Sequence, residues 1–243
     1  MAKVLKMGSA KSKLEINPQK SFQIMSDKIL KGVKRNQTIP SGSFAYELRN
    51  LGDVFAERGQ KAEMNKASKK LAETLVSLKN SDLAGVIYSF LVKFNEDNPK
   101  VAEEFAVNGL AVAKKLRDDV HIVARCHDLR DIYKASDPKS DKHLKIMYEE
   151  KRALSNIVND YNAAEKRYNT ISRKMAPKSK YEFLLGSVKV EIGKFLLEKE
   201  PKTALIELKE AKGIFEKLGD EKALSKIESL ISRIFSWEKS SRK

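Results

Sequence analysis

Apolar residues recur at helical spacing along most of the chain. Phe44, Leu48, Leu51 and Phe55 are separated by four, three and four residues, and the same spacing recurs over residues 83–94. Such spacing places one apolar stripe along a helix. No sustained two-residue alternation is present, so the pattern predicts an all-α protein without a sheet.

Turn signals divide this pattern into about ten to eleven helices. Asn17-Pro18 and Asn98-Pro99 are typical helix starts, in which a capping side chain precedes proline at the first helical position. Ser41 and Ser81 are predicted to cap two further helices. The predicted helices are 18–35, 42–58, 61–79, 82–95, 99–116, 119–135, 140–154, 156–174, 181–198, 201–218 and 220–238.

One stretch leaves the number of helices open. Residues 140–174 contain no Gly or Pro, so they fit one continuous helix as well as two. All predicted connections are short, which favours antiparallel neighbouring helices. Such a chain forms either a closed bundle or a stacked superhelix, and internal repetition favours the second.

Three segments carry that repetition. Leu48–Gly59 resembles the first helix of a tetratricopeptide repeat, with Leu51, Gly52, Phe55 and Gly59 in the family's order. Looser matches begin at Leu129, where Arg130 replaces the glycine, and at Ile192, where Ala204, Leu208 and Ala211 follow. The tripeptides at 116–118 and 218–220 resemble the Leu-Gly-Asp sequence that is common between such repeats. The resemblance implies an α-solenoid of stacked antiparallel helix pairs, a tetratricopeptide-like superhelix with irregular repeats.

The same resemblance implies a binding scaffold with a concave groove. In that family the small residue lets the partner helix approach closely, and the aromatic fills the space between helices. The positions that carry over to the concave face are Tyr46, Arg49, Asp53, His127, Asp131 and Lys189. The first hypothesis is therefore a non-enzymatic protein–protein interaction scaffold that holds an acidic peptide or helix in this groove.

Charge supports a second hypothesis. The 243-residue chain carries a formal net charge of +15, and much of it lies in two places. Residues 1–35 hold nine basic against two acidic residues, and residues 165–180 hold six against one. An RNA-associated or DNA-associated protein would use such blocks for phosphate contacts. The candidate contacts are Lys11, Lys13, Lys31, Lys34, Arg35, Lys166, Arg167, Arg173 and Lys174.

The domain organisation follows from the same pattern. Residues 1–17 are predicted to be a basic, flexible N-terminal arm, and a solubilising tail is the alternative to phosphate contact. Residues 18–243 are predicted to form one helical domain, with a subdivision near 175–180 as the alternative. The C-terminal helix ends in Phe235 and Trp237, which would support self-association if no later helix covers them.

Catalytic and metal-binding patterns are not found in the sequence. The adjacent pairs Glu103/Glu104 and Glu149/Glu150 point to different sides of a helix, so we expect solvated faces. His121 and His127 are six residues apart and do not share a helical face. Neither a phosphate-binding glycine loop nor a nucleophile elbow occurs. We therefore expect no enzyme activity, no cofactor and no metal.

Compartment is inferred from what the sequence lacks. Cys126 is the one cysteine, which excludes an intrachain disulfide and fits a small core residue. No apolar run reaches about 18 residues, and the N-terminus lacks the apolar region of a secretory signal. A mitochondrial presequence is a weaker alternative because residues 1–17 contain no Arg. The expectation is a cytoplasmic protein without membrane contact.

Overall fold

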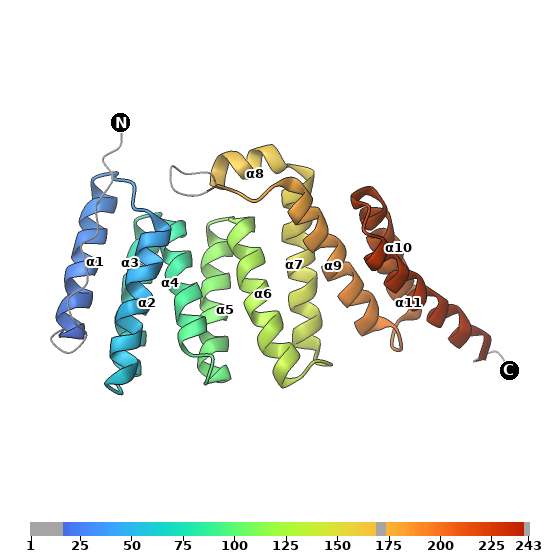
Figure 1. The fold of residues 1–243 in the computed structure, drawn as a ribbon, viewed down its shortest axis with the longest axis horizontal. Coiled ribbons are helices and arrows are strands. Elements are labelled where there is room, and N and C mark those ends of the chain that lie inside the picture. Colours follow the sequence, from blue (N-terminus) through green and yellow to red (C-terminus); the bar gives the residue numbers. More distant parts are fainter. Residues whose placement is uncertain (1–16, 169–173, 241–243) are drawn as a thin grey trace. The chain divides into compact units, whose positions relative to one another are not determined.

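The computed structural model describes residues 17–168 and 174–240, and every regular element within these ranges is an α-helix. The predicted all-α class is confirmed, and successive helices pack as neighbours within residues 18–115 and within residues 178–240, as in a helical-repeat fold (Figure 1). The eleven described helices are α1 (Pro18–Lys34), α2 (Ser41–Glu57), α3 (Lys61–Ser77), α4 (Ser81–Phe94), α5 (Pro99–Lys115), α6 (Asp119–Ser136), α7 (Asp141–Asn159), α8 (Tyr161–Tyr168), α9 (Lys178–Leu196), α10 (Pro201–Leu218) and α11 (Glu221–Ser240).

The described residues divide into two compact units. Unit 1 runs to His121 and includes Tyr168 and Lys174, whereas unit 2 comprises Ile122–Arg167 and continues from Met175. The sequence suggested one domain from residue 18, with a subdivision near 175–180 as the alternative. One boundary between the two units, at Lys174/Met175, lies close to that subdivision. Another, at His121/Ile122, falls inside α6.

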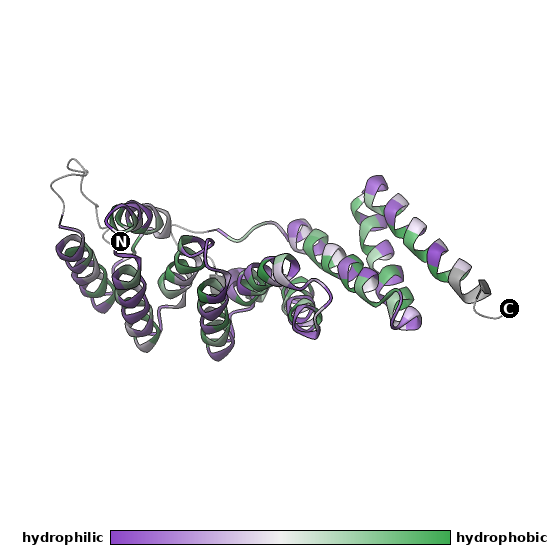
Figure 2. Ribbon diagram, turned by 90° about the horizontal axis from the view of Figure 1, so that it is seen from below, coloured by the Kyte–Doolittle hydropathy of each residue, from purple (hydrophilic) through white to green (hydrophobic). Residues whose placement is uncertain are grey.

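Unit 1 is a stack in which α1 contacts α2 and α3, α2 contacts α4, and α4 contacts α5. Its core contains the predicted stripe, with Phe44, Leu48 and Phe55 almost fully buried. Burial of such side chains contributes about 1.5–3 kcal/mol each. Figure 2 shows hydrophobic and hydrophilic sides on each of these helices, as expected for a stack that buries one face of each helix.

Unit 2 is built around α9, which contacts both α7 and α10, and α11 packs on α10. The predicted small residues allow close packing here. A Cβ atom at Gly193 would lie 2.7 Å from Cγ of Leu208 on α10. Ala204 and Ala211 flank Leu208 and are fully buried. Cys126 is also fully buried, as the sequence indicated.

Five turns in the described part of the chain share one hydrogen-bond pattern. In each, a residue with positive φ ends a helix, and the next amide donates to the carbonyl five residues earlier. Examples are Gln60 N to Phe55 O at 2.8 Å and Asp220 N to Phe215 O at 3.1 Å, after Gly59 and Gly219 with φ of 68°. This is the Schellman arrangement. The similar tripeptides at 116–118 and 218–220 therefore form the same type of turn.

Two predicted caps and one helix boundary were wrong. Pro40 and Asn80, not Ser41 and Ser81, are the N-cap residues of α2 and α4. The side chain of Asn80 accepts from Leu83 N at 3.1 Å, which the shorter side chain of Ser81 cannot do from inside the helix. Residues 140–168 form two helices that meet at Asp160 (φ −131°) rather than near residue 155.

The caps at the Asn-Pro starts are confirmed. Asn17 accepts from Lys20 N at 2.9 Å, and Asn98 accepts from Val101 N at 3.4 Å. The described helices contain no stretch with the length and low charge that a bilayer-spanning helix needs.

Candidate functional site

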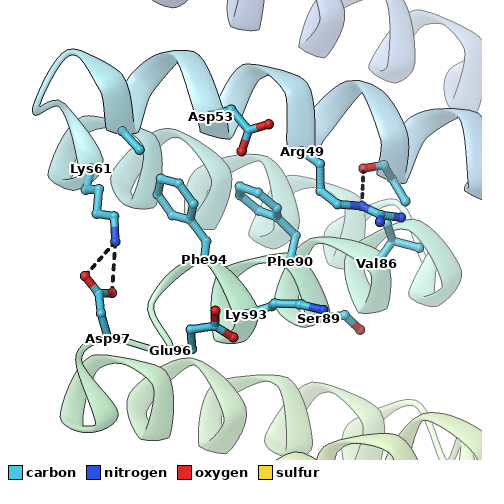
Figure 3. Close-up of a pocket in the computed structure, with 12 residues that line it drawn as sticks. Arg49, Asp53, Lys61, Val86, Ser89, Phe90, Lys93, Phe94, Glu96 and Asp97 are labelled. Atoms are coloured by element: carbon cyan, nitrogen blue, oxygen red, sulfur yellow. Dashed lines mark hydrogen bonds and ion pairs between the residues drawn. The ribbon is translucent and has the colours of Figure 1, made fainter.

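An open groove in unit 1 has a volume of about 750 Å³. One wall is α2, the other is α4, and the ends are formed by the first residue of α3 and the α4–α5 turn (Figure 3). Its lining residues are Ala45, Arg49, Asp53, Ala56, Lys61, Val86, Ser89, Phe90, Lys93, Phe94, Glu96 and Asp97. This volume is in the range of small-molecule and peptide sites.

Two aromatic rings form the floor of the groove. Phe90 and Phe94 stack with centroids 5.1 Å apart, and both rings point toward α2 in Figure 3. They reach α2 at Gly52, where a Cβ atom would lie 2.8 Å from the Phe90 ring and 3.3 Å from Phe94. The small residue predicted from the repeat pattern therefore does allow the close approach of α2 and α4.

Charged side chains of both signs surround these rings. Lys61 Nζ lies 2.8 Å from Asp97 Oδ2 and 5.3 Å from the Phe94 centroid. The hydrogen bond from Lys61 lowers the pKa of the exposed Asp97 carboxyl. Arg49 and Lys93 form no ion pair with any described residue, and Arg49 Nε reaches only its own helix, at Ala45 O (3.4 Å).

Among the sequence-predicted groove residues, Arg49 and Asp53 line this groove and Tyr46 does not. Tyr46 is 66% exposed on α2. Phe90 and Phe94 were not predicted as groove residues, because their spacing matches the core stripe of α4. Gly52 was the sequence signal that could have revealed these two rings, since a glycine on a packed helix face leaves room for a bulky side chain of the neighbouring helix.

The other three predicted groove residues lie in unit 2. His127 and Asp131 are exposed on α6, with Nε2 and Oδ2 3.7 Å apart. Lys189 is 7% exposed and forms ion pairs with Glu207 and Glu210 of α10. Glu207 also accepts from Lys151 at 2.5 Å. Lys189 therefore holds α9 to α10, which does not support its predicted role as an exposed groove residue.

The basic residues predicted to contact phosphate are only partly described. Lys31, Lys34 and Arg35 are exposed at the end of α1, and Lys166 and Lys174 are also exposed. Lys11, Lys13 and Arg173, together with the side chain of Arg167, lie outside the described residues. Phe235 is 46% exposed on α11, and the side chain of Trp237 is outside the described part.

One group of potential metal ligands occurs in unit 1. Asp82, Asp118 and His121 bring ligand atoms within 4.8 Å of one another. Asp118 caps α6 by accepting from His121 N at 3.1 Å, and its other oxygen pairs with Nδ1 of His121 at 2.7 Å. Burial would raise the pKa of Asp118, but these contacts with His121 outweigh it and lower the pKa. The capping contacts explain why Asp118 and His121 lie together.

Glu150 departs from the expectation of a solvated face. Glu150 is 1% exposed, and its Oε2 atom lies 3.0 Å from the guanidinium of Arg130 on α6. Arg130 also lies 3.7 Å from Glu191 of α9. Burial raises the pKa of Glu150 to about 7, against the charge of Arg130, which lowers it. Glu150 lies where α7 faces both α6 and α9, so it is enclosed although its neighbour Glu149 is not.

Comparisons with known proteins do not identify a family for this chain. No protein-family model matches the chain, and no curated protein sequence matches it. Among solved structures, a crystal structure of the de novo designed helical repeat protein DHR64 is similar, with 12% sequence identity. The match covers 93% of this chain and 98% of that one, with a TM-score of 0.25. At that score the likeness carries no argument about function.

Proposed function

We propose that this chain is a non-enzymatic scaffold that binds a peptide or helix of another protein in the groove between α2 and α4. The observation that carries the proposal is the pair of stacked rings, Phe90 and Phe94, on the floor of an open groove flanked by Arg49 and Lys93. An apolar side chain of the peptide would lie against the rings. An acidic residue would pair with Arg49 or Lys93.

A tetratricopeptide-like arrangement of unit 1 belongs to this proposal. In that arrangement α2 and α4 are the first helices of successive pairs, and Gly52 is the small residue at their contact. Helix pairs begin at Ser41, Ser81 and Asp119, so they are 40 and 38 residues apart. The repeats are longer than the 34 residues of the tetratricopeptide family, which fits the irregular array inferred from the sequence.

The test begins with selection of peptides from a random display library on the full chain. We expect the selected peptides to share an apolar residue followed or preceded by an acidic one. Binding of a selected peptide is then measured by fluorescence anisotropy with Arg49→Glu and with Arg58→Glu as the matched control. Arg58 follows the same helix and does not line the groove.

The proposal requires that Arg49→Glu weakens binding about tenfold or more, equivalent to about 1.4 kcal/mol, whereas Arg58→Glu leaves it unchanged. A peptide whose acidic residue is replaced by Lys should regain affinity for Arg49→Glu. Absence of any selected peptide, or equal loss in both variants, would refute the groove as the binding site.

A further inference from the structure

A second cavity, in unit 2, has the character of an anion site. Its volume is about 360 Å³, and its lining comes from α6, α7, α9 and the α6–α7 turn. The lining residues are Lys134, Pro138, Lys139, His143, Met147, Glu191, Lys194, Phe195, Glu198 and Lys199. Four lysines therefore face two glutamates around one small cavity.

The lysines of this cavity are only partly balanced by acidic groups. Lys134, Lys139, Lys194 and Lys199 form no ion pair within the described part of the chain. Of the two glutamates beside them, Glu191 is shared with Arg130 at 3.7 Å. Ammonium groups gathered around a cavity without partners repel one another, and a bound anion would relieve that repulsion.

Lys194 shows this repulsion most clearly. Burial lowers the pKa of Lys194, and the charges of Lys226 on α11 and Lys134 on α6 lower it further, whereas Glu191 raises it. Its ammonium group therefore lies near two other cations from different helices. An anion at this point would contact groups from α6 and α9, with Lys226 close by.

One wall of the cavity is formed by rings and an apolar side chain. Phe195 packs edge-on against His143 with ring centroids 6.2 Å apart. The imidazole is held by Nδ1, which lies 2.9 Å from the carbonyl oxygen of Pro138. Met147 completes this wall and is 1% exposed. A ligand would therefore place an apolar body beside its charged group.

We propose that this cavity binds a small phosphate monoester, with the phosphate among Lys134, Lys139 and Lys194 and an apolar body against Phe195. A carboxylate is the weaker candidate because it carries one negative charge, whereas a phosphate monoester carries about −1.5 to −2 near neutral pH and neutralises more of the lysine charge. The cavity is lined by four lysines and no arginine. This site is distinct from the peptide groove of unit 1 and does not depend on it.

Isothermal titration of the full chain with phenyl phosphate tests the site at constant ionic strength and pH 7.5. Inorganic phosphate and benzoate are titrated in parallel, because each lacks one half of the proposed ligand. The variant is Lys134→Met/Lys194→Met, and the control is Lys145→Met/Lys209→Met. The control lysines are exposed on α7 and α10 and do not line the cavity.

We expect saturable binding of phenyl phosphate at one site, weaker binding of inorganic phosphate and of benzoate, and a loss of about tenfold or more in the cavity variant. The control should bind like the parent chain. Thermal melting checks the fold, and Lys134→Met alone replaces the double variant if that one melts early. Equal affinity in the cavity variant and the control, or binding of benzoate as tight as that of phenyl phosphate, would overturn the proposal.

Discussion

Glu150 and Lys189 show how position in a stack decides the state of a charged residue. Glu150 lies between two charged residues in the sequence and Lys189 between two valines, yet both are buried where neighbouring helices pack. Burial of a charge is costly unless a partner compensates it. Arg130 compensates Glu150, and Glu207 with Glu210 compensates Lys189.

The raised pKa of Glu150 makes the stability of unit 2 depend on pH. The carboxyl binds its proton more tightly in the folded state, with a pKa of about 7 against 4.5 for the ordinary group. Its contribution is therefore fully present below pH 4.5 and is lost as pH rises through 7. At about 1.4 kcal/mol per pKa unit, the loss amounts to about 3–4 kcal/mol.

Glu150→Gln should remove this loss. We expect the free energy of unfolding in urea to fall less between pH 5 and pH 8.5 in Glu150→Gln than in the parent chain. Arg130 keeps its contact with Glu191 in the variant. The neighbouring change Glu149→Gln serves as control and should retain the parent pH dependence. An identical pH dependence in all three proteins would show that Glu150 does not titrate in this range.

Helices are the scale at which the sequence was most informative. The helices bury stripes spaced at three and four residues, and most connections contain a local stop signal, so both features can be found without knowledge of the partner helix. The end of α7 was misplaced because the residues around Asp160 include neither Gly nor Pro. There the chain ends one helix and starts the next without either residue.

The groove could not be predicted from the patterns of single helices. Phe90 and Phe94 carry the spacing of a core stripe, and their exposure depends on how α4 meets α2 across Gly52. That contact joins residues almost forty positions apart. Arg49 and Asp53 were predicted correctly as groove residues because the family resemblance placed them there. The same resemblance also placed Tyr46, which does not line the groove.

The repeated turn makes a prediction about its glycines. Gly59 has a φ of 68°, and a Cβ atom there would meet nothing within 4 Å. Gly59→Ala therefore introduces backbone strain without any clash, and we expect a loss of about 1 kcal/mol in the free energy of unfolding. Urea titration followed by circular dichroism measures it.

Gly42→Ala is the matched control for this change. Gly42 lies in the first turn of α2, and a Cβ atom there also meets nothing within 4 Å, but its φ is not positive. Alanine is the better helix former, so this variant should be neutral or gain a few tenths of a kcal/mol. Equal losses in both variants would mean that the positive φ of Gly59 contributes nothing to stability.

At the scale of the whole molecule, the net charge of +15 predicts binding to any polyanion at low salt. Specific recognition of RNA would need affinity that survives near 0.15 M salt. If the chain is a protein-binding scaffold, its contact with RNA is the non-specific kind, with dissociation constants on the order of 1–100 µM near physiological salt.

A salt series with labelled RNA separates the two hypotheses. We expect affinity to fall steeply with salt, and removal of residues 1–16 to weaken binding and reduce the slope, because fewer phosphates are neutralised. Removal of residues 1–36 would be a poorer test, since Phe22, Met25 and Ile29 of α1 are buried in the core of unit 1. A dissociation constant well below about 1 µM near 0.15 M salt would favour the RNA-associated hypothesis over the scaffold. Arg49→Glu should leave RNA binding almost unchanged, because it alters the peptide groove and only one of many positive charges.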